Sequence, residues 1–333
     1  MKPWIGARLI VSVALLTTLG WTADGWGQAK IPRVGILSAP LLTGAAHEAI
    51  LQWYEPLRRA LAEHGWVEGK SVSFEYRSAP GNPPRYDEAA AELLRLKVDV
   101  IYAESAPATR AAYAATRTVP IVALDYTNDP VTAGYAETYA RPSRNLTGLF
   151  LDAPSFAGKW LELLKSIVPG LSRVAVIWDP SPGGTIHLDA VRGAARTFRV
   201  QLQVLEVHEL RDIEKAFAAL RPRSQALIIL PSPMTWGQSA RLAELATQHR
   251  LPATSMALPF AEAGGVLSYG PDPESALERC GILVGRILSG AKPADLAVER
   301  PSKFVLAVNL KTAKALQLRI PDSIVLNADK VIK

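Results

Sequence analysis

Short apolar runs rich in Val and Ile alternate with segments of helical periodicity along nearly the whole chain. Residues 33–37 (RVGIL) form the first such run, and a helical pattern follows over residues 47–64. In that pattern Ile50, Tyr54 and Leu57 recur at three- and four-residue spacing, which is typical of an amphipathic helix. Repeated strand–helix alternation predicts α/β architecture, with parallel sheets covered by helices on both faces.

The alternation runs through two halves that share element order but no sequence repeat. The first half predicts strands at 33–37, 72–76, 98–102 and 119–124 and helices at 47–64, 86–96 and 107–117. Pro56 should kink the first helix or mark its true start. The second half predicts strands at 174–178, 202–207, 226–230, 252–256 and 264–269 and helices at 156–167, 186–198, 213–220 and 236–249. Each half should therefore form its own sheet, giving two Rossmann-like lobes.

Three segments should connect the lobes. Residues 145–148 and 268–272 look like connections, and the helix after Pro273 should return to the first lobe. The strand predicted at 303–308 would make a third crossing, followed by a short helix at 312–318 that Pro321 closes. We therefore expect lobe 1 to contain residues 31–147 plus 272–304, and lobe 2 to contain residues 148–271 plus 305–333.

Residues 1–29 have the pattern of a secretory signal peptide. Lys2 and Arg8 precede an apolar run of about 11 residues, 9–19, and small residues follow near Gly27 and Ala29. The run is too short to span a membrane, which takes roughly 20 residues. Because no cysteine stands near the expected cleavage site, we expect a periplasmic product without a lipid anchor. Among exported α/β proteins, the capture of solutes is the leading function.

The net charge and the motifs of the sequence disfavour several other classes of protein. The net charge is +6, and +5 without Lys2, Arg8 and Asp24, but the basic residues are scattered, so we expect no nucleic-acid partner. The single cysteine, Cys280, lies in an apolar helical run and is expected to be a buried structural thiol. The sequence contains no phosphate-binding loop, dinucleotide fingerprint or hydrolase motif, and its five histidines are far apart. We therefore expect no cofactor, no metal and no catalytic activity.

Ligands of open parallel sheets bind just beyond the carboxyl ends of the strands. The polar and aromatic residues at those positions are the candidate ligand-binding residues: Ser38, Ser105, Thr109, Asp125, Tyr126, Asp129, Trp178, Asp179, Ser232, Ser255 and Tyr269. Free N–H groups at the helix start near Ala106 could hold a carboxylate, and Asp125 or Asp129 could pair with an ammonium group.

Several of these candidates have plainer alternatives. Asp129 could simply cap the turn at Pro130, Trp178 could belong to the core, and Ser105 could be only a helix N-cap. Glu104 also follows a predicted strand, and together with Asp129 it could form the acid/base pair of an exported hydrolase.

The order of several short motifs is familiar. Residues 119–122 (VPIV) precede Asp129-Pro-Val and Gly134, and then come Ala140-Arg-Pro and Asn145-Leu-Thr-Gly148. This order resembles the ABC-transporter substrate-binding protein family related to the tryptophan/tyrosine-type binding proteins. Residues 65–69, 261–265, 268–270 and the tail from Pro301 to Pro321 extend the resemblance to nearly all of residues 31–333.

The resemblance implies a type 1 periplasmic-binding fold with three crossovers, a ligand in the cleft, and an ABC permease and ATPase as partners. Ser38, Ser105, Asp129, Ser232 and Tyr269 match positions of the family's site, whereas Asp125 and Trp178 come from the strand-end rule alone. Glu104 departs from the family, which commonly has small residues there. A cleft-facing Glu104 would repel a ligand carboxylate.

We therefore expect a monomeric periplasmic solute-binding component of an ABC importer that closes about a hinge on an aromatic or branched amino acid or an aromatic acid. An exported enzyme on the same fold and a sensor that presents its ligand-loaded lobes to a membrane receptor are the alternatives. A transcription regulator of this fold is disfavoured by the signal pattern and by the lack of an N-terminal DNA-binding helix pair.

Overall fold

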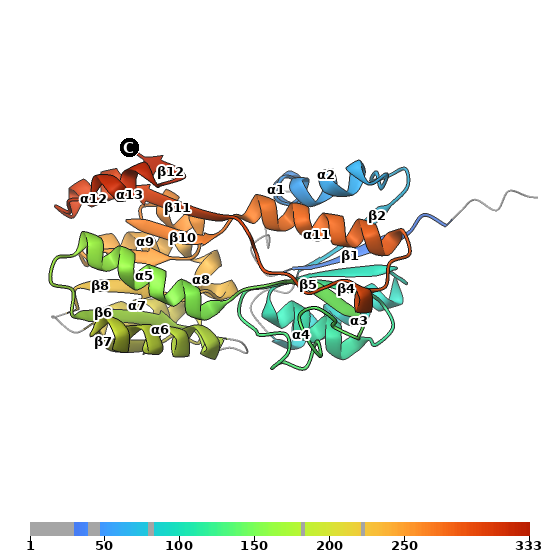
Figure 1. Cartoon of the computed structure of the whole chain (residues 1–333), viewed down its shortest axis with the longest axis horizontal. Helices are drawn as coiled ribbons and strands as arrows, with labels where there is room; N and C mark the ends of the chain where they lie inside the picture. Colours follow the sequence, from blue (N-terminus) through green and yellow to red (C-terminus); the bar gives the residue numbers. More distant parts are fainter. Residues whose placement is uncertain (1–29, 39–46, 79–82, 181–183, 221–223) are drawn as a thin grey trace, which may run out of the picture. The chain divides into compact units, whose positions relative to one another are not determined.

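The computed structural model describes residues 30–38, 47–78, 83–180, 184–220 and 224–333. The first sheet has five parallel strands in the order β2-β1-β3-β4-β5 (Figure 1). These strands are β1 (Arg33–Ser38), β2 (Ser73–Ser78), β3 (Val100–Glu104), β4 (Ile121–Asp125) and β5 (Leu146–Phe150). The four strands predicted for this half are confirmed, within a few residues at each end.

Alternating side chains of the first sheet enter two different cores. Val100 and Tyr102 of β3 pack beneath α2 (Glu55–Glu63) and α11 (Pro273–Leu288). Ile101 and Ala103 pack on the opposite face, beneath α3 (Pro83–Arg95) and α4 (Ala106–Ala115). Because successive strand residues point to opposite faces, a continuous apolar run fits a sheet that is covered on both sides.

The second sheet has seven strands in the order β12-β11-β10-β9-β8-β6-β7. They are β6 (Arg173–Trp178), β7 (Gln201–Glu206), β8 (Ala226–Ile229), β9 (Ala253–Ser255), β10 (Leu267–Pro271), β11 (Phe304–Asn309) and β12 (Lys330–Ile332). The expectation of wholly parallel sheets is wrong at one pair, because β10 and β11 are antiparallel. The chain leaves this sheet through β10 and re-enters it through β11, so the two strands run in opposite directions.

Helices cover both faces of the second sheet as well. They are α5 (Ala153–Ile167), α6 (Gly184–Phe198), α7 (Leu210–Ala218), α8 (Pro233–Gly237), α9 (Ser239–Gln248), α10 (Leu258–Glu262), α12 (Leu310–Ala315) and α13 (Asp322–Leu326). The strand β12 and the helices α10 and α13 are absent from the sequence prediction. They are three to five residues long, which is too short for a hydrophobic period to be recognised.

The predicted helix at 47–64 is two helices, α1 (His47–Trp53) and α2. Pro56 stands in the first turn of α2, where a missing N–H costs nothing. The expected effect of Pro56, that it marks a helix start, is therefore confirmed. The break at Tyr54 turns both Trp53 and Tyr54 toward the end of β3.

Residues 146–148 belong to β5 and residues 268–271 to β10, so the expectation that residues 145–148 and 268–272 are only connections is wrong. The Asn145 amide donates to the Val119 carbonyl over 2.8 Å, and Thr147 donates to the carbonyl of Leu296 over 3.0 Å. Gly148 has φ 142°, and a Cβ there would lie 2.0 Å from the Ala123 carbonyl oxygen. Only glycine permits this close approach between β5 and β4. The motif thus has a structural role at the edge of the first sheet.

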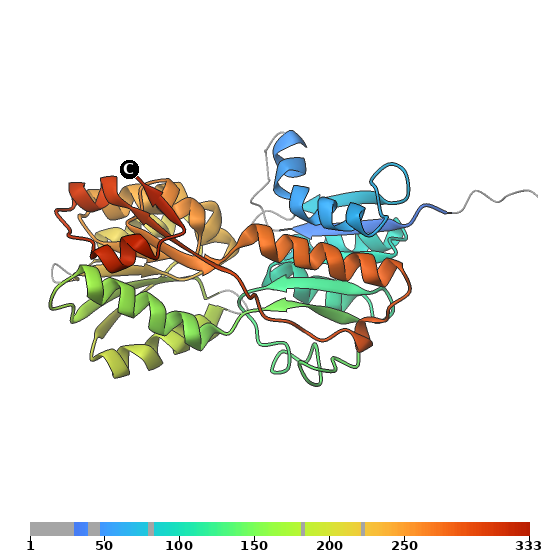
Figure 2. The same ribbon diagram turned by 45° about the horizontal axis from the view of Figure 1, so that its top comes forward.

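The chain passes between the sheets after β5, between β10 and α11, and before β11. As expected, α11 returns to the first sheet, where Leu277 and Cys280 join its core beside α2 (Figure 2). Residues 148–150 belong to the first sheet and Phe304 to the second, so the strands extend past the expected lobe boundaries at 147 and 305. The division into lobes itself stays a prediction.

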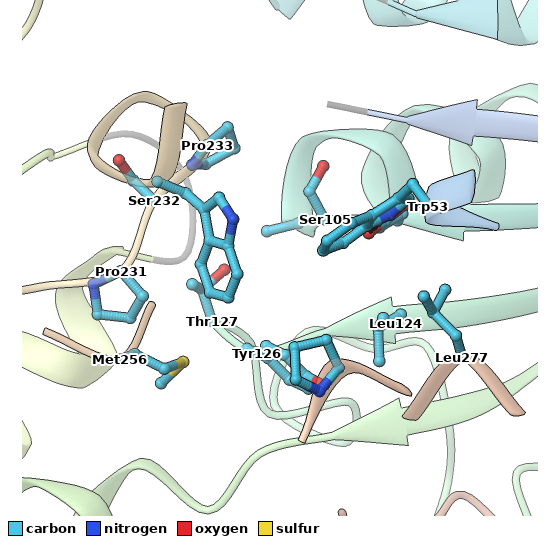
Figure 3. Close-up of a pocket in the computed structure, with 14 residues that line it drawn as sticks. Trp53, Ser105, Leu124, Tyr126, Thr127, Pro231, Ser232, Pro233, Met256 and Leu277 are labelled. Atoms are coloured by element: carbon cyan, nitrogen blue, oxygen red, sulfur yellow. Dashed lines mark hydrogen bonds between the residues drawn. The ribbon is translucent and has the colours of Figure 1, made fainter. Parts of the chain in front are cut away.

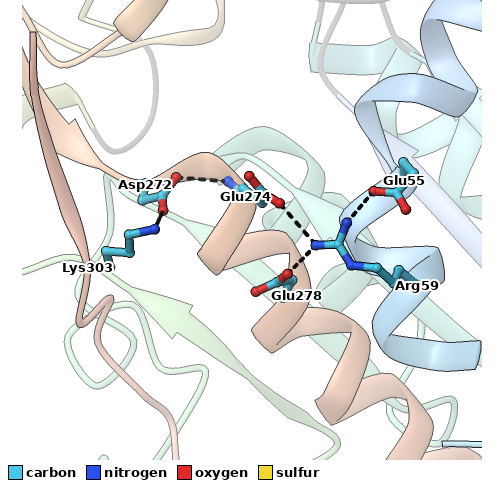
Figure 4. Close-up of polar contacts among 6 residues, drawn as sticks. All are labelled: Glu55, Arg59, Asp272, Glu274, Glu278 and Lys303. Carbon is cyan, nitrogen blue, oxygen red and sulfur yellow. Dashed lines mark hydrogen bonds and ion pairs between the residues drawn. The ribbon is translucent and has the colours of Figure 1, made fainter. Parts of the chain in front are cut away.

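Charged side chains join the crossing segments to the helices beside them (Figure 4). Arg59 of α2 forms ion pairs with Glu274 over 3.0 Å and with Glu278, both in α11. Asp272 accepts the Glu274 N–H at the start of α11 and pairs with Lys303 over 2.7 Å. Two of the crossings are therefore linked to each other, and one of them is fastened to the first sheet.

The expected signal peptide, residues 1–29, lies outside the described residues. Among the helices that the structure describes, none is both long and apolar enough to cross a membrane.

Candidate functional site

A pocket lies between the carboxyl ends of strands from both sheets (Figure 3). It is lined by Trp53, Glu104, Ser105, Ala106, Leu124, Tyr126, Thr127, Pro231, Ser232, Pro233, Trp236, Met256, Pro273 and Leu277. Trp53 and Ser105 lie on one side of this space, and Ser232 and Pro233 lie on the other. The pocket therefore lies at the edge of each sheet to which the strand-end rule points.

Three of the predicted ligand-binding residues line this pocket: Ser105, Tyr126 and Ser232. The other predicted residues lie outside its lining, and they are Ser38, Thr109, Asp125, Asp129, Trp178, Asp179, Ser255 and Tyr269. The prediction that any of the eleven touches a solute remains a prediction.

Ser105 links β3 to α4 in an unusual backbone conformation. Its φ is 114°, a region that costs energy for a residue with a Cβ. As the N-cap of α4 its side chain makes no capping bond, and its Oγ has no hydrogen-bond partner among the described residues. The oxygen is itself buried, so it is not exposed to a ligand in this conformation. Thr109, one turn further on, is fully buried within the protein, outside the pocket lining.

Among the described residues that line the pocket, Glu104 is the only Asp, Glu, Lys, Arg or His. Its Oε1 accepts a bond from Trp53 Nε1 over 3.2 Å, and its Oε2 accepts one from the Tyr54 hydroxyl over 2.6 Å. Burial raises the pKa of Glu104 above its ordinary value, although the bonds from Tyr54 and Trp53 lower it in part. Ser38 is buried outside the pocket lining, where its side chain interacts with the Tyr54 hydroxyl.

Asp125 ends the neighbouring strand, β4, but its carboxylate accepts hydrogen bonds from the loop that follows it. Its carboxylate accepts bonds from the backbone N–H groups of Thr127 and Asn128, over 2.9 and 3.1 Å. It also accepts the Asn128 amide over 2.6 Å and the Thr127 hydroxyl over 3.2 Å. Burial raises its pKa, and these bonds oppose the rise. Asp125 therefore orders the segment that carries Tyr126 and Thr127.

Asp129 caps the turn at Pro130, which is the structural role that the sequence analysis gave as the alternative to ligand binding. Its carboxylate accepts the N–H groups of Val131 and Thr132, over 3.0 and 2.7 Å, and the Tyr139 hydroxyl over 2.7 Å. Burial alone would raise the pKa of Asp129, but these bonds hold it below its ordinary value. Of the suspected acid/base pair, only Glu104 lines the pocket.

The second sheet contributes a capped helix start. Ser232 Oγ accepts the Thr235 N–H over 3.1 Å, and Thr235 Oγ1 accepts the Ser232 N–H over 2.9 Å. This reciprocal capping fixes the first turn of α8, which carries Pro233 and Trp236. Ser255 is likewise engaged, since its Oγ accepts the Ala257 N–H over 3.2 Å.

Tyr126 connects the pocket to the second half of the chain. Its backbone carbonyl accepts a bond of 2.6 Å from Nε2 of His187, a fully buried residue of α6. A carbonyl can only accept, so Nε2 must carry the hydrogen. Burial lowers the pKa of His187 to about 4, so the imidazole is neutral at pH 7.

Three further predicted residues belong to the packing of the second half. Trp178 lies against the apolar core around Trp160, and Asp179 is buried beside it in sequence. Tyr269 stacks near Phe156 at a ring distance of 5.4 Å, and its carbonyl accepts Trp160 Nε1 over 2.9 Å. These contacts place Tyr269 in an aromatic cluster close to the crossings.

The sequence analysis missed two of the three aromatic side chains that line the pocket, and also Leu277. Trp53 and Trp236 come from helices, and Leu277 from the returning helix α11. Trp53 fits the apolar period of the first helical pattern, so it looked like a core residue. Extending the strand-end rule to the first turn of the following helix would have found Trp236. Nothing in the local sequence points to Trp53 or Leu277, which tertiary packing brings in.

Cys280 is a free, buried thiol whose pKa burial raises well above its ordinary value, as expected of a structural cysteine. Within the described ranges, no group of three or more His, Cys, Asp or Glu side chains lies together in a way that could hold a metal ion.

Comparison with known proteins gives three findings. Residues 42–332 match the family model described as ABC transporter substrate binding protein. The tyrosine-binding protein of Clostridioides difficile strain R20291 is 24% identical over 266 residues, which cover 78% of this chain and 75% of that protein. Two solved structures have a similar fold. A conserved domain protein from Vibrio cholerae has a TM-score of 0.82 at 25% identity, with coverage of 91% of this chain and 100% of that one.

The second structure is an ABC domain from Streptococcus pneumoniae in complex with L-Trp. Its TM-score is 0.80 at 21% identity, with coverage of 90% of this chain and 99% of that one.

Proposed function

The chain belongs to the ABC transporter substrate-binding protein family, and we propose that it captures a small solute in the pocket between its two sheets and delivers it to an ABC importer. The observation that carries this proposal is the composition of the pocket wall. Side chains from the strand ends of both sheets line it, and so do Pro273 and Leu277 of the helix that follows a crossing. A ligand there would contact both halves of the chain at once.

The walls favour a solute with a flat apolar part. Trp53, Tyr126 and Trp236 offer aromatic faces, and Leu124, Met256 and Leu277 complete an apolar surface. The similar proteins are described as tyrosine-binding and as a complex with L-Trp. Both facts support an aromatic amino acid or a related aromatic compound as the solute class.

The proposed mechanism is closure about the crossings. A solute that contacts both halves favours the conformation in which both sets of contacts form, and it shifts the population only by its preference for that conformation. X-ray scattering of the purified full chain, with and without saturating L-tyrosine, L-tryptophan and related aromatic compounds, tests this. We expect a smaller radius of gyration with the ligand that binds. An unchanged radius at confirmed saturation would reject closure.

The transport role has its own tests. We propose that the chain is exported to the periplasm without a lipid anchor, acts there as a monomer, has no catalytic activity, and works with a separate permease and ATPase.

Fractionation of cells that produce the full chain should find it in the periplasmic extract. Reconstitution with the permease should make uptake of the solute depend on this protein. Recovery of the solute chemically unchanged after release would separate binding from turnover.

A further inference from the structure

Glu104 is a buried carboxylate held at the wall of the pocket by two donors from outside its own strand. Only 9% of the residue is exposed. Trp53 Nε1 and the Tyr54 hydroxyl each bond a different carboxylate oxygen. Each oxygen of an ionised carboxylate can accept a further bond, so both keep acceptor capacity after these contacts. The group is fixed in position and still able to bind.

The described lining of the pocket provides no cation for this carboxylate. None of the residues that line the pocket is Lys, Arg or His. The charge of Glu104 acts on five titratable groups from different elements, and they are Tyr54, Tyr86, Tyr102, Tyr126 and Cys280. All five have raised pKa values and are neutral at pH 7. A buried charge without a counter-charge is costly, so a ligand that brings a cation gains affinity.

A ligand carboxylate would have the opposite effect beside Glu104. Like charges in a poorly solvated site repel, and no basic side chain of the lining offsets that repulsion. The aromatic faces of Trp53, Tyr126 and Trp236 attract cations as well as apolar rings.

The geometry points to Glu104 as the counter-charge for a protonated amine of the solute, so that the pocket selects aromatic compounds that carry an amine over those that carry only a carboxylate. This inference rests on the proposed function and narrows it. It assigns the amine to Glu104, whereas the sequence analysis had considered Asp125 and Asp129 for that role. Both of those carboxylates already accept hydrogen bonds from the loops that contain them.

Titration calorimetry of the full chain with matched probes tests the inference. The probes are tyramine and tryptamine, their amino acids L-tyrosine and L-tryptophan, and the acids 4-hydroxyphenylacetate and indole-3-acetate. We expect the amines and amino acids to bind and the acids to bind at least about 30-fold more weakly. Equal or tighter binding of the acids would overturn the inference but leave a solute-binding function intact. Failure of every probe to bind would overturn both the inference and the aromatic solute class.

Two variants separate charge from shape. Glu104→Gln keeps the size of the side chain and should weaken tyramine or tryptamine binding by about 30-fold or more. Glu278→Gln is the matched control, because Glu278 follows Leu277 in α11 but pairs with Arg59; it should change affinity less than about threefold. If Glu104→Gln bound the amines with the same affinity as the wild-type chain does, the assignment of Glu104 would be wrong.

The pH dependence of binding provides a readout that a merely structural role would not give. An ammonium ligand prefers the ionised carboxylate, so its affinity should rise as the pH increases through the raised pKa of Glu104. Binding in that range should release a proton, which calorimetry in buffers of different ionisation enthalpy detects. In Glu104→Gln the release should disappear. Proton uptake by the wild-type chain would contradict the inference.

Discussion

The ends of β3 and β4 offer a direct comparison, because each of these neighbouring strands ends in a buried carboxylate. Asp125 accepts four hydrogen bonds, all from Thr127 and Asn128 within its own loop. Glu104 accepts two, from Trp53 and Tyr54, which are about fifty residues away in sequence. The local set satisfies Asp125 completely, whereas the distant set leaves Glu104 open toward the pocket. Position at a strand end therefore does not distinguish a loop-forming carboxylate from a ligand-facing one.

Removal of Asp125 should have the largest effect. Asp125→Ala leaves four partly buried donors without their acceptor and should lower the free energy of unfolding by about 4 kcal/mol. Chemical denaturation at pH 7 measures this change. Asp125→Asn, which keeps one acceptor oxygen, should cost about half as much. A fully stable Asp125→Ala chain that had lost solute binding would show that Asp125 acts on the ligand, and the comparison would fail.

The loop after β4 also depends on His187, whose neutral ring donates to the Tyr126 carbonyl. The pKa of His187 is about 4 in the folded chain and 6.5 as a model value, so the unfolded chain binds the proton more tightly. Stability from this group is therefore present above pH 6.5 and is lost as the pH falls toward 4, by up to about 3 kcal/mol.

Denaturation of the wild type and of His187→Gln at several pH values from 7 to 4 measures the loss. The stability difference between the two chains should shrink as the pH falls. A difference that is constant over this range would show that His187 does not titrate there, because both chains share every other titrating group.

Replacement of Glu104 should destabilise the chain less than replacement of Asp125, because only two donors depend on its carboxylate. Its pKa is raised in the folded chain, so its contribution to stability is greatest at low pH and is lost as the pH rises through the raised value. Without ligand, Glu104→Gln should therefore be more stable than the wild type at neutral pH, by about 1 kcal/mol. Thermal denaturation at pH 4 and pH 7 compares them, and the advantage should be smaller at pH 4. A variant that is strongly destabilised at both values would make Glu104 a structural residue like Asp125.

The smallest effect is expected at Ser105. Its Oγ has no partner among the described residues, so Ser105→Ala should change the free energy of unfolding by less than about 0.5 kcal/mol. Ser232→Ala is the matched change across the pocket and should cost about 1 kcal/mol, because Ser232 caps α8. Denaturation curves of the two variants measured side by side decide this. Equal losses would mean that the Ser105 hydroxyl has a bond within the protein.

Much of the fold could be predicted because its signals are local. The positions of strands and helices follow from runs rich in Val and Ile, from helical periodicity and from Pro56. Each of these signals depends only on neighbours within a few residues. The strand order of the second sheet could not be predicted in the same way. The antiparallel pairing of β10 with β11 follows from where the chain re-enters the sheet, more than thirty residues after it left.

The candidate site can likewise be separated into a part that the sequence predicts and a part that depends on tertiary structure. The sequence by itself determined that polar and aromatic residues gather at the carboxyl ends of parallel strands, because strand direction follows from the alternation. It also provided the family motifs, and Asn145-Leu-Thr-Gly148 among them has a structural role in β5. Only the tertiary structure decided which strand-end groups face the pocket. The break at Tyr54 brings Trp53 and Tyr54 to Glu104, while Asp125 is satisfied by its own loop. Those outcomes depend on which donors reach each carboxylate, and that is a matter of packing in three dimensions.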